Sequence, residues 1–185
     1  MTDPVLDFWF DFASTHSYLA ASRIRPLAAA EQVRVRFRPF LLRPIFQAQG
    51  WDTSPFNLYE AKGRYMWRDM ERLSAGLNLP FRRPDPFPQY SVLPARVALV
   101  GLAQGWGEDF SVAVYTAQFV EDGRIDEPHI LAEILSVMNV DAQAALEAAQ
   151  MLGVFGAPSF TTADGELFWG NDRLEQALAW AKRGG

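Results

Sequence analysis

Hydrophobic and polar residues alternate along the first stretch of the chain. Between residues 5 and 12 every second position is hydrophobic, and the positions between them include two carboxylates. Because successive side chains of a β-strand point to opposite faces, this period of two predicts a strand. The alternation returns at 33–38, apolar residues against arginines, and Pro39 ends it. An Ala-rich stretch with helical spacing from Ser14 to Ala30 lies between them, so the first 38 residues predict a βαβ unit.

The rest of the chain reads as loop, then helices, then strands. Residues 39–56 are rich in turn formers and predict a loop, and 81–89 hold three prolines and predict an irregular segment. Helical spacing predicts helices at 58–77, 91–104, 108–121, 127–138 and 142–150. Strand patterns at 159–162 and 166–169 flank an Asp-Gly turn, and a helix is predicted at about 172–182. We therefore expect an α/β fold whose domain is split between 1–45 and 151–185, with an all-α domain inserted at 46–150.

Charge and cysteine content exclude several kinds of chemistry. The chain holds 17 Lys+Arg and 22 Asp+Glu residues, a net charge of −5, so no general attraction to nucleic acid is expected. It holds no cysteine, which excludes a disulfide framework, a zinc thiolate site and a protein thiol nucleophile. With 2 histidines, no metal site is expected either. Any sulfur chemistry must use an external thiol.

The hydrophobic pattern does not suggest a signal peptide or a membrane span. The N-terminal stretch has no basic start and is interrupted by Asp7 and Asp11, which argues against a signal peptide. No apolar run approaches the roughly 20 residues that span a bilayer. We expect a cytoplasmic protein without a membrane partner.

Three local features could carry chemistry. Ser14 begins the first helix, where free N–H groups favour an anion, but the same serine could be a plain helix cap. The Gly-rich turn before the 159–162 strand contains Ala157-Pro158, a candidate cis peptide that would turn backbone polar groups toward an extended ligand. Asp172 could pair with a ligand ammonium or simply cap the last helix. Local patterns leave these alternatives open, and His16 could be a base, a ligand or an exposed residue.

Five motifs, taken in order and spacing, carry a resemblance that covers nearly the whole chain. They are Asp11-Phe12-Ala13-Ser14 with Ser17-Tyr18-Leu19, Arg38-Pro39-Phe40-Leu41, Lys62-Gly63-Arg64-Tyr65, Val154-Phe155-Gly156-Ala157-Pro158 and Phe168-Trp169-Gly170-Asn171-Asp172-Arg173-Leu174. Together they resemble the 2-hydroxychromene-2-carboxylate isomerase family and its relatives, the kappa-class glutathione transferases. The resemblance implies the thioredoxin-like fold of bacterial disulfide oxidoreductases (DsbA-like), with an inserted helical domain, and a homodimer.

The resemblance also implies glutathione as cofactor and roles for individual residues. Ser14 matches the serine that hydrogen-bonds the glutathione thiolate, at the place of the first cysteine of a disulfide oxidoreductase. Ala157, before the expected cis Pro158, would bond the cysteinyl backbone. Asp172 and Arg173 match a pair near the γ-glutamyl end, and Lys62 matches a lysine at the glycyl carboxylate. Asn57 is a possible stand-in for an asparagine that the family has at about residues 51–54.

The implied reaction is a glutathione-dependent isomerisation of a small aromatic acid. Reversible thiol addition opens the ring of 2-hydroxychromene-2-carboxylate and yields trans-o-hydroxybenzylidenepyruvate, a step of aromatic compound catabolism. A glutathione transferase or peroxidase and a non-catalytic thioredoxin-like binding module are the alternatives. The apolar substrate pocket, or else the helix core, would use six aromatic residues: Trp51, Phe56, Tyr65, Trp67, Phe87 and Tyr90.

Overall fold

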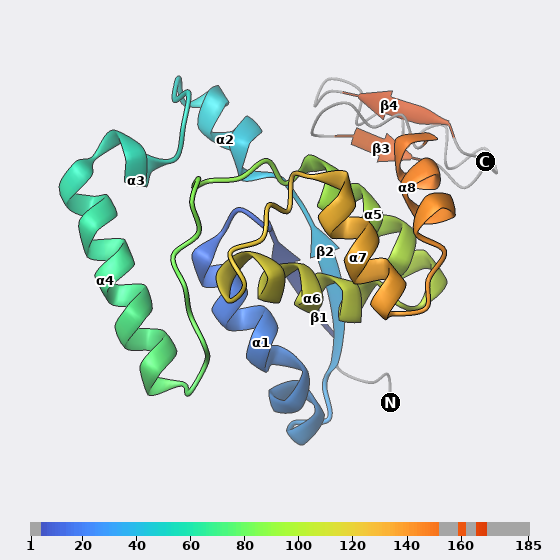
Figure 1. The fold of residues 1–185 in the computed structure, drawn as a ribbon, viewed down its shortest axis with the longest axis horizontal. Coiled ribbons are helices and arrows are strands. Elements are labelled where there is room, and N and C mark those ends of the chain that lie inside the picture. Colours follow the sequence, from blue (N-terminus) through green and yellow to red (C-terminus); the bar gives the residue numbers. More distant parts are fainter. Residues whose placement is uncertain (1–4, 152–158, 162–165, 170–185) are drawn as a thin grey trace.

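The computed structural model describes residues 5–151, 159–161 and 166–169, and its centre is a βαβ unit (Figure 1). Strand β1 (Val5–Phe10) pairs in parallel with β2 (Arg34–Pro39), and α1 (Thr15–Ala30) connects them. This confirms the prediction drawn from the two alternating stretches. The strands are shorter or shifted by a few residues, because Asp11 and Phe12 belong to the turn that leads into α1.

Helices make up the middle of the chain, and β3 (Ser159–Thr161) pairs antiparallel with β4 (Leu167–Trp169), as predicted. The helices are α2 (Leu42–Ala48), α3 (Pro55–Leu58), α4 (Glu60–Gly76), α5 (Val92–Gln104), α6 (Gly107–Phe119), α7 (Pro128–Val137) and α8 (Ala142–Met151). The five predicted helices are confirmed within a few residues. The predicted turn at 164–165 and the predicted last helix lie outside the described residues.

The prediction of a loop over 39–56 is wrong, because α2 and α3 lie within it. Hydrophobic residues at 41, 42, 45 and 46 have helical spacing, which the many turn formers around them obscure. Pro44 and Pro55 both fall in the first turn of their helices, where the missing N–H has no intrahelical partner to lose.

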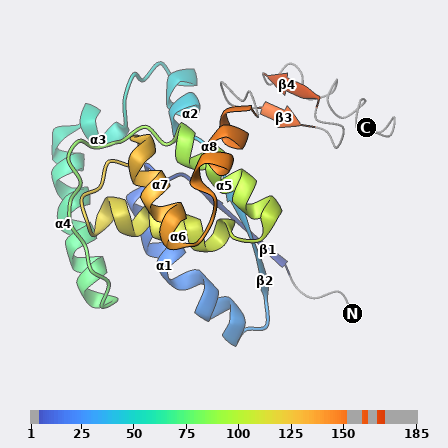
Figure 2. The ribbon, with the colours of Figure 1, turned by 45° about the vertical axis from the view of Figure 1, so that its right-hand side comes forward.

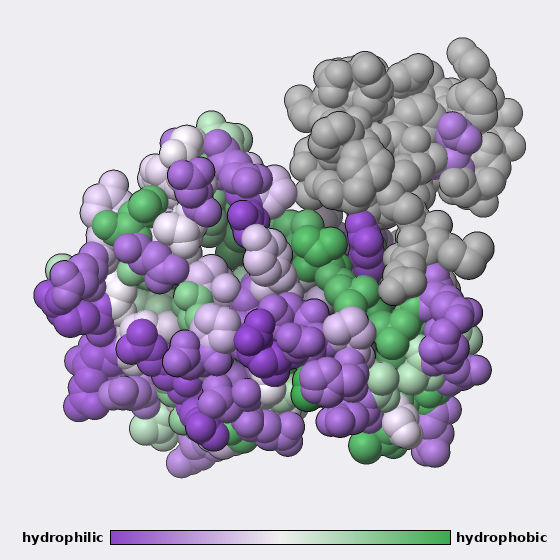
Figure 3. Space-filling model, turned by 45° about the horizontal axis from the view of Figure 1, so that its top comes forward, coloured by the Kyte–Doolittle hydropathy of each residue, from purple (hydrophilic) through white to green (hydrophobic). Residues whose placement is uncertain are grey.

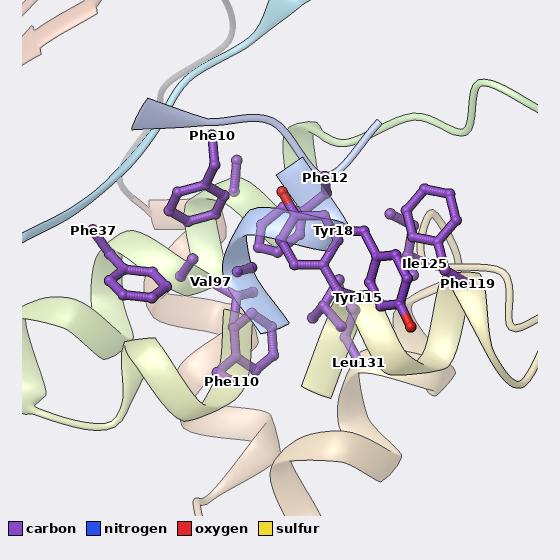
Figure 4. Close-up of a cluster of buried hydrophobic side chains, with 14 of the residues drawn as sticks. Phe10, Phe12, Tyr18, Phe37, Val97, Phe110, Tyr115, Phe119, Ile125 and Leu131 are labelled. Carbon is purple, nitrogen blue, oxygen red and sulfur yellow. The ribbon is translucent and has the colours of Figure 1, made fainter. Parts of the chain in front are cut away.

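Aromatic side chains join the strands to α1, α5 and α6 (Figure 4). The ring of Phe12 lies 5.2 Å from that of Tyr115, and Tyr18 stacks on Phe119 at 5.2 Å. These separations are typical of favourable aromatic pairs. Phe10 continues the cluster toward the sheet, so the end of β1 is held in a dry environment. The division into two domains stays a prediction.

Helix α4 lies at the edge of the molecule, away from β1 and β2, in both ribbon views (Figures 1 and 2). It is joined to α3 by the close approach of Gly63 to the Phe56 carbonyl group, which a Cβ at residue 63 would clash with. A glycine there lets α3 and α4 meet. Within the described part of the chain, no helix combines the length and apolar character needed to cross a membrane.

Candidate functional site

Ser14 stands between the end of β1 and the first turn of α1. It is the N-cap of α1, in extended conformation, and its Oγ accepts the Ser17 N–H at 3.2 Å. The Ser14 N–H donates to the Asp11 carbonyl oxygen at 2.9 Å, which fixes the turn. The capping role is therefore present, and it leaves the Ser14 hydroxyl proton without an acceptor among the described residues. That proton can serve an anion beside the helix N-terminus.

The carboxylate of Asp11 ties the Ser14 turn to the chain that follows β2. Its side chain is only 2% exposed, its Oδ1 accepts the Ala13 N–H at 2.9 Å, and its Oδ2 accepts the Leu42 N–H at 2.6 Å. Burial raises the pKa of Asp11, while these N–H groups and the Ser91 hydroxyl oppose the rise. Asp11 thus holds α1 and α2 at a fixed separation.

Two buried residues support the same turn from behind. The Tyr115 hydroxyl of α6 donates to the Asp11 carbonyl oxygen at 2.9 Å, and burial raises the pKa of Tyr115 well above its usual value. Thr15 is also buried and its hydroxyl donates to the Met66 sulfur of α4 at 3.7 Å. The turn is therefore held from α2, α4 and α6, which favours a fixed position for Ser14.

A cavity of about 480 Å³ opens beside Ser14, a size typical of small-molecule sites. Its walls come from the Ser14 turn, from residues 41–57 and from residues 87–92. The aromatic lining consists of Phe46, Trp51, Phe56, Phe87 and Tyr90. The described face that carries α2 and α3 mixes hydrophilic and hydrophobic residues (Figure 3). The cavity offers aromatic walls together with hydroxyl, amide and charged groups.

The structure brings some of the predicted site residues together and not others. Ser14, His16 and Asn57 line the cavity, and the Asn57 Nδ2 donates to Thr53 Oγ1 at 3.1 Å. Lys62 is exposed on the first turn of α4 and does not belong to the lining. Ala157, Pro158, Asp172 and Arg173 lie outside the described residues, and so does the predicted cis peptide.

Four of the six residues of the predicted aromatic pocket line the cavity, and Tyr65 and Trp67 do not. Trp67 packs on Phe87 with ring centroids 4.8 Å apart, which is the core alternative. Sequence reasoning missed Arg43 and Asp52, which also line the cavity. The helical spacing of the hydrophobic residues at 41–46 was the signal for α2, the helix that carries Arg43. Among the described residues, no cluster of three metal-binding side chains occurs.

The fold and this site define a thioredoxin-like protein of the DsbA type. The model of the DSBA-like thioredoxin domain family matches residues 5–150, and the chain belongs to that family. The solved structure of a 2-hydroxychromene-2-carboxylate isomerase covers 97% of this chain and 95% of its own, with a TM-score of 0.70 and 23% identity. The cytosolic disulfide reductase DsbM from Pseudomonas aeruginosa with GSH has a TM-score of 0.54 at 18% identity, covering 97% and 96%. These likenesses show the fold.

Two curated relatives have sequences similar to this chain over nearly its full length. The 2-hydroxychromene-2-carboxylate isomerase of Sphingobium xenophagum is 29% identical over 187 residues, covering 92% of this chain and 94% of the relative. The enzyme of the same name from Pseudomonas putida is 28% identical, covering 92% and 90%. These relatives support an isomerase function for the chain.

Proposed function

We propose that this protein is a glutathione-dependent isomerase of 2-hydroxychromene-2-carboxylate-type acids. The observation that carries the proposal is Ser14, whose hydroxyl proton has no acceptor among the described residues, at a helix N-terminus on the wall of a cavity of about 480 Å³. The chain has no cysteine of its own. The site is therefore equipped to hold a thiolate that arrives with a cofactor.

Bound glutathione would supply a thiolate that adds reversibly to the unsaturated acid and leaves again, so none is consumed. The chain's contribution is to lower the free energy of that anion. The N-terminus of α1 carries a partial positive charge, and the Ser14 hydroxyl adds a donor that does not need to be reorganised. Asp11 and Tyr115 hold that donor in place through the turn. Both features favour the charged form of a thiol at this point.

The aromatic walls suit the ring of the substrate. Trp51, Phe56 and Phe87 contribute apolar surface to the cavity, and aromatic side chains bind flat rings by stacking or edge contacts. Asn57 offers an amide to the same cavity. A pocket of this kind excludes water from a ring-opening reaction while its polar groups orient the acid.

The remaining glutathione contacts are proposed from the family resemblance of the sequence alone. Ala157 and Pro158 would bond the cysteinyl backbone, Asp172 and Arg173 would meet the γ-glutamyl end, and Lys62 would meet the glycyl carboxylate. A homodimer is part of the same proposal. Each of these contacts is testable by the effect of a single substitution on the dissociation constant of glutathione.

The experiment supplies the purified protein with the chromene acid, with and without glutathione, and follows the trans-pyruvate together with total free thiol. We expect turnover that requires glutathione and leaves its concentration unchanged. One glutathione lost per product molecule would indicate a transferase and contradict the proposal. Calorimetry that detects no glutathione binding would favour the binding module instead.

A further inference from the structure

One cationic side chain lines the cavity beside Ser14 and has no role in the reaction as proposed so far. Arg43, on the first turn of α2, lines the cavity, and its guanidinium carbon lies 4.7 Å from the centre of the Tyr90 ring. Tyr90 lines the same cavity, so the pair belongs to its wall. A guanidinium over an aromatic face is attracted to the ring, and this attraction restrains the arginine side chain.

The N–H donors of Arg43 have no partner among the described residues. Eight arginines of the described chain pair with carboxylates, among them Arg36 with Asp7 at 2.6 Å, and Arg43 is not one of them. Nor does its side chain donate a hydrogen bond to any described residue. The N–H groups of a guanidinium form a planar fork that matches a carboxylate.

The other charged groups on the wall do not compete for this role. Asp11 is buried and its oxygens accept backbone N–H groups, and Asp52 is exposed and outside ion-pair distance of Arg43. His16 lines the cavity as an exposed imidazole. Arg43 is the one arginine or lysine among the described lining residues. A small anionic group entering this cavity therefore meets a single oriented guanidinium.

We propose that Arg43, held by Tyr90, binds the carboxylate of the aromatic acid and so selects acids over neutral ring compounds. This rests on the proposed function, which it deepens by naming the residue that recognises the acid. Ser14 and Arg43 then hold two different groups, the thiolate and the substrate carboxylate. The stated role is binding, so its loss affects KM more than kcat.

The test uses three variants of the full chain. Arg43→Met keeps the length of the side chain and removes its charge, Arg43→Lys keeps the charge and removes the fork, and Arg83→Met is the matched control. Arg83 also lies 4.7 Å over a ring, that of Trp67, but outside the cavity lining. At saturating glutathione we expect Arg43→Met to raise KM for the chromene acid about tenfold, with kcat changed less than about twofold. Arg43→Lys raises KM less, and Arg83→Met leaves it unchanged.

A binding experiment separates this proposal from the proposed function. The dissociation constants of the product acid and of its carboxamide are measured by titration on each variant. The unchanged protein is expected to prefer the acid about tenfold, and Arg43→Met to lose that preference. Equal preference in both proteins overturns the assignment, whether or not the protein turns the chromene acid over.

Glutathione also carries carboxylates, so its binding is measured in parallel. Calorimetry is expected to give the same glutathione dissociation constant for the unchanged protein and for Arg43→Met. If Arg43→Met weakened the binding of glutathione and not that of the product acid, Arg43 would be assigned to the cofactor, which would overturn the proposal. If His16→Gln removed the preference for the acid and Arg43→Met did not, the carboxylate would belong to the imidazole, which overturns it as well.

Discussion

Two aspartates four positions apart, one within the first strand and one just after it, have different partners and different roles. Asp7, in the middle of β1, accepts hydrogen bonds from Arg36 at 2.8 and 2.6 Å and from Arg38 at 2.9 Å, all on β2. These arginines lower the pKa of Asp7 to about 2. Asp11, just past the strand, is buried, accepts backbone N–H groups, and has a raised pKa because burial disfavours its charge. Asp7 therefore links the side chains of the two paired strands, and Asp11 holds the turn beside Ser14.

The two carboxylates also respond to pH in opposite directions. The lowered pKa of Asp7 means that its contribution to stability is present above about pH 4 and is lost as the pH falls toward 2. The raised pKa of Asp11 means that its protonated form favours the folded state, an effect that is lost as the pH rises through the raised value. We expect changes at the site to alter activity. Changes at the middle of β1 should alter stability instead, mainly above about pH 4, where Asp7 is charged in the folded and unfolded chain.

Ser14→Ala should have the largest effect. The variant keeps the helix N-terminus and loses one preorganised donor, a change that typically lowers kcat by about 10²–10³. Loss of the cap should cost only about 0.5–2 kcal/mol in the free energy of unfolding. Steady-state turnover and urea unfolding of one preparation check both numbers. Unchanged turnover with lowered stability would reduce Ser14 to a helix cap.

Asp11→Asn should have the next largest effect. The amide accepts one of the two backbone N–H groups and turns its own NH₂ toward the other, so a buried donor is left facing a donor. We expect a loss of about 1–3 kcal/mol in the free energy of unfolding and a fall in kcat, because the Ser14 turn is released. Asp7→Asn is the matched control and should leave kcat unchanged. Equal kcat in both variants would remove the difference between the two aspartates.

Tyr115→Phe should have a smaller effect in the same direction. It removes the hydroxyl that donates to the Asp11 carbonyl oxygen and keeps the ring in the aromatic cluster. The expected cost is about 1 kcal/mol in the free energy of unfolding, with a modest fall in kcat. Thermal unfolding and turnover are the measurements. A stability loss without any change in kcat would show that the turn keeps its position through Asp11 alone.

Asp7→Asn should have the smallest effect, seen only in the dependence of stability on pH. Urea unfolding of the natural protein should lose free energy between about pH 4 and pH 2 as Asp7 is protonated, and the variant should lack this part of the loss. The difference between the two proteins should therefore shrink as the pH falls. A difference that stays constant over this range would mean that the arginines of β2 do not stabilise the charged form.

The sequence predicted those features that depend on neighbours along the chain. The alternation at 5–12, the Ser14 cap and the long helices are local patterns, and the structure confirms them. The DsbA-like fold was predicted from five motifs and is confirmed by the family match. The short helix α2 was missed because a proline and scattered polar residues hide its hydrophobic spacing.

The cavity could not be predicted in the same way, because it forms where three distant segments meet. Nothing in the pattern at 41–57 indicates that Arg43 lies over Tyr90, which follows 47 positions later. Asp11 reads as one polar position of an alternating stretch, and only the fold reveals that its carboxylate accepts the Leu42 N–H. Tertiary contacts of this kind decide burial and hydrogen bonding, which local periodicity does not contain.

The ultraviolet absorbance of bound glutathione thiolate, followed against pH, tests the central claim most directly. In the natural protein the pKa of the bound thiol should lie below that of free glutathione, because the α1 N-terminus and the Ser14 hydroxyl favour the anion. In Ser14→Ala it should rise toward the free value, while calorimetry confirms that glutathione stays bound. A thiol pKa equal to that of free glutathione in the natural protein, or the same value in both proteins, would contradict the account.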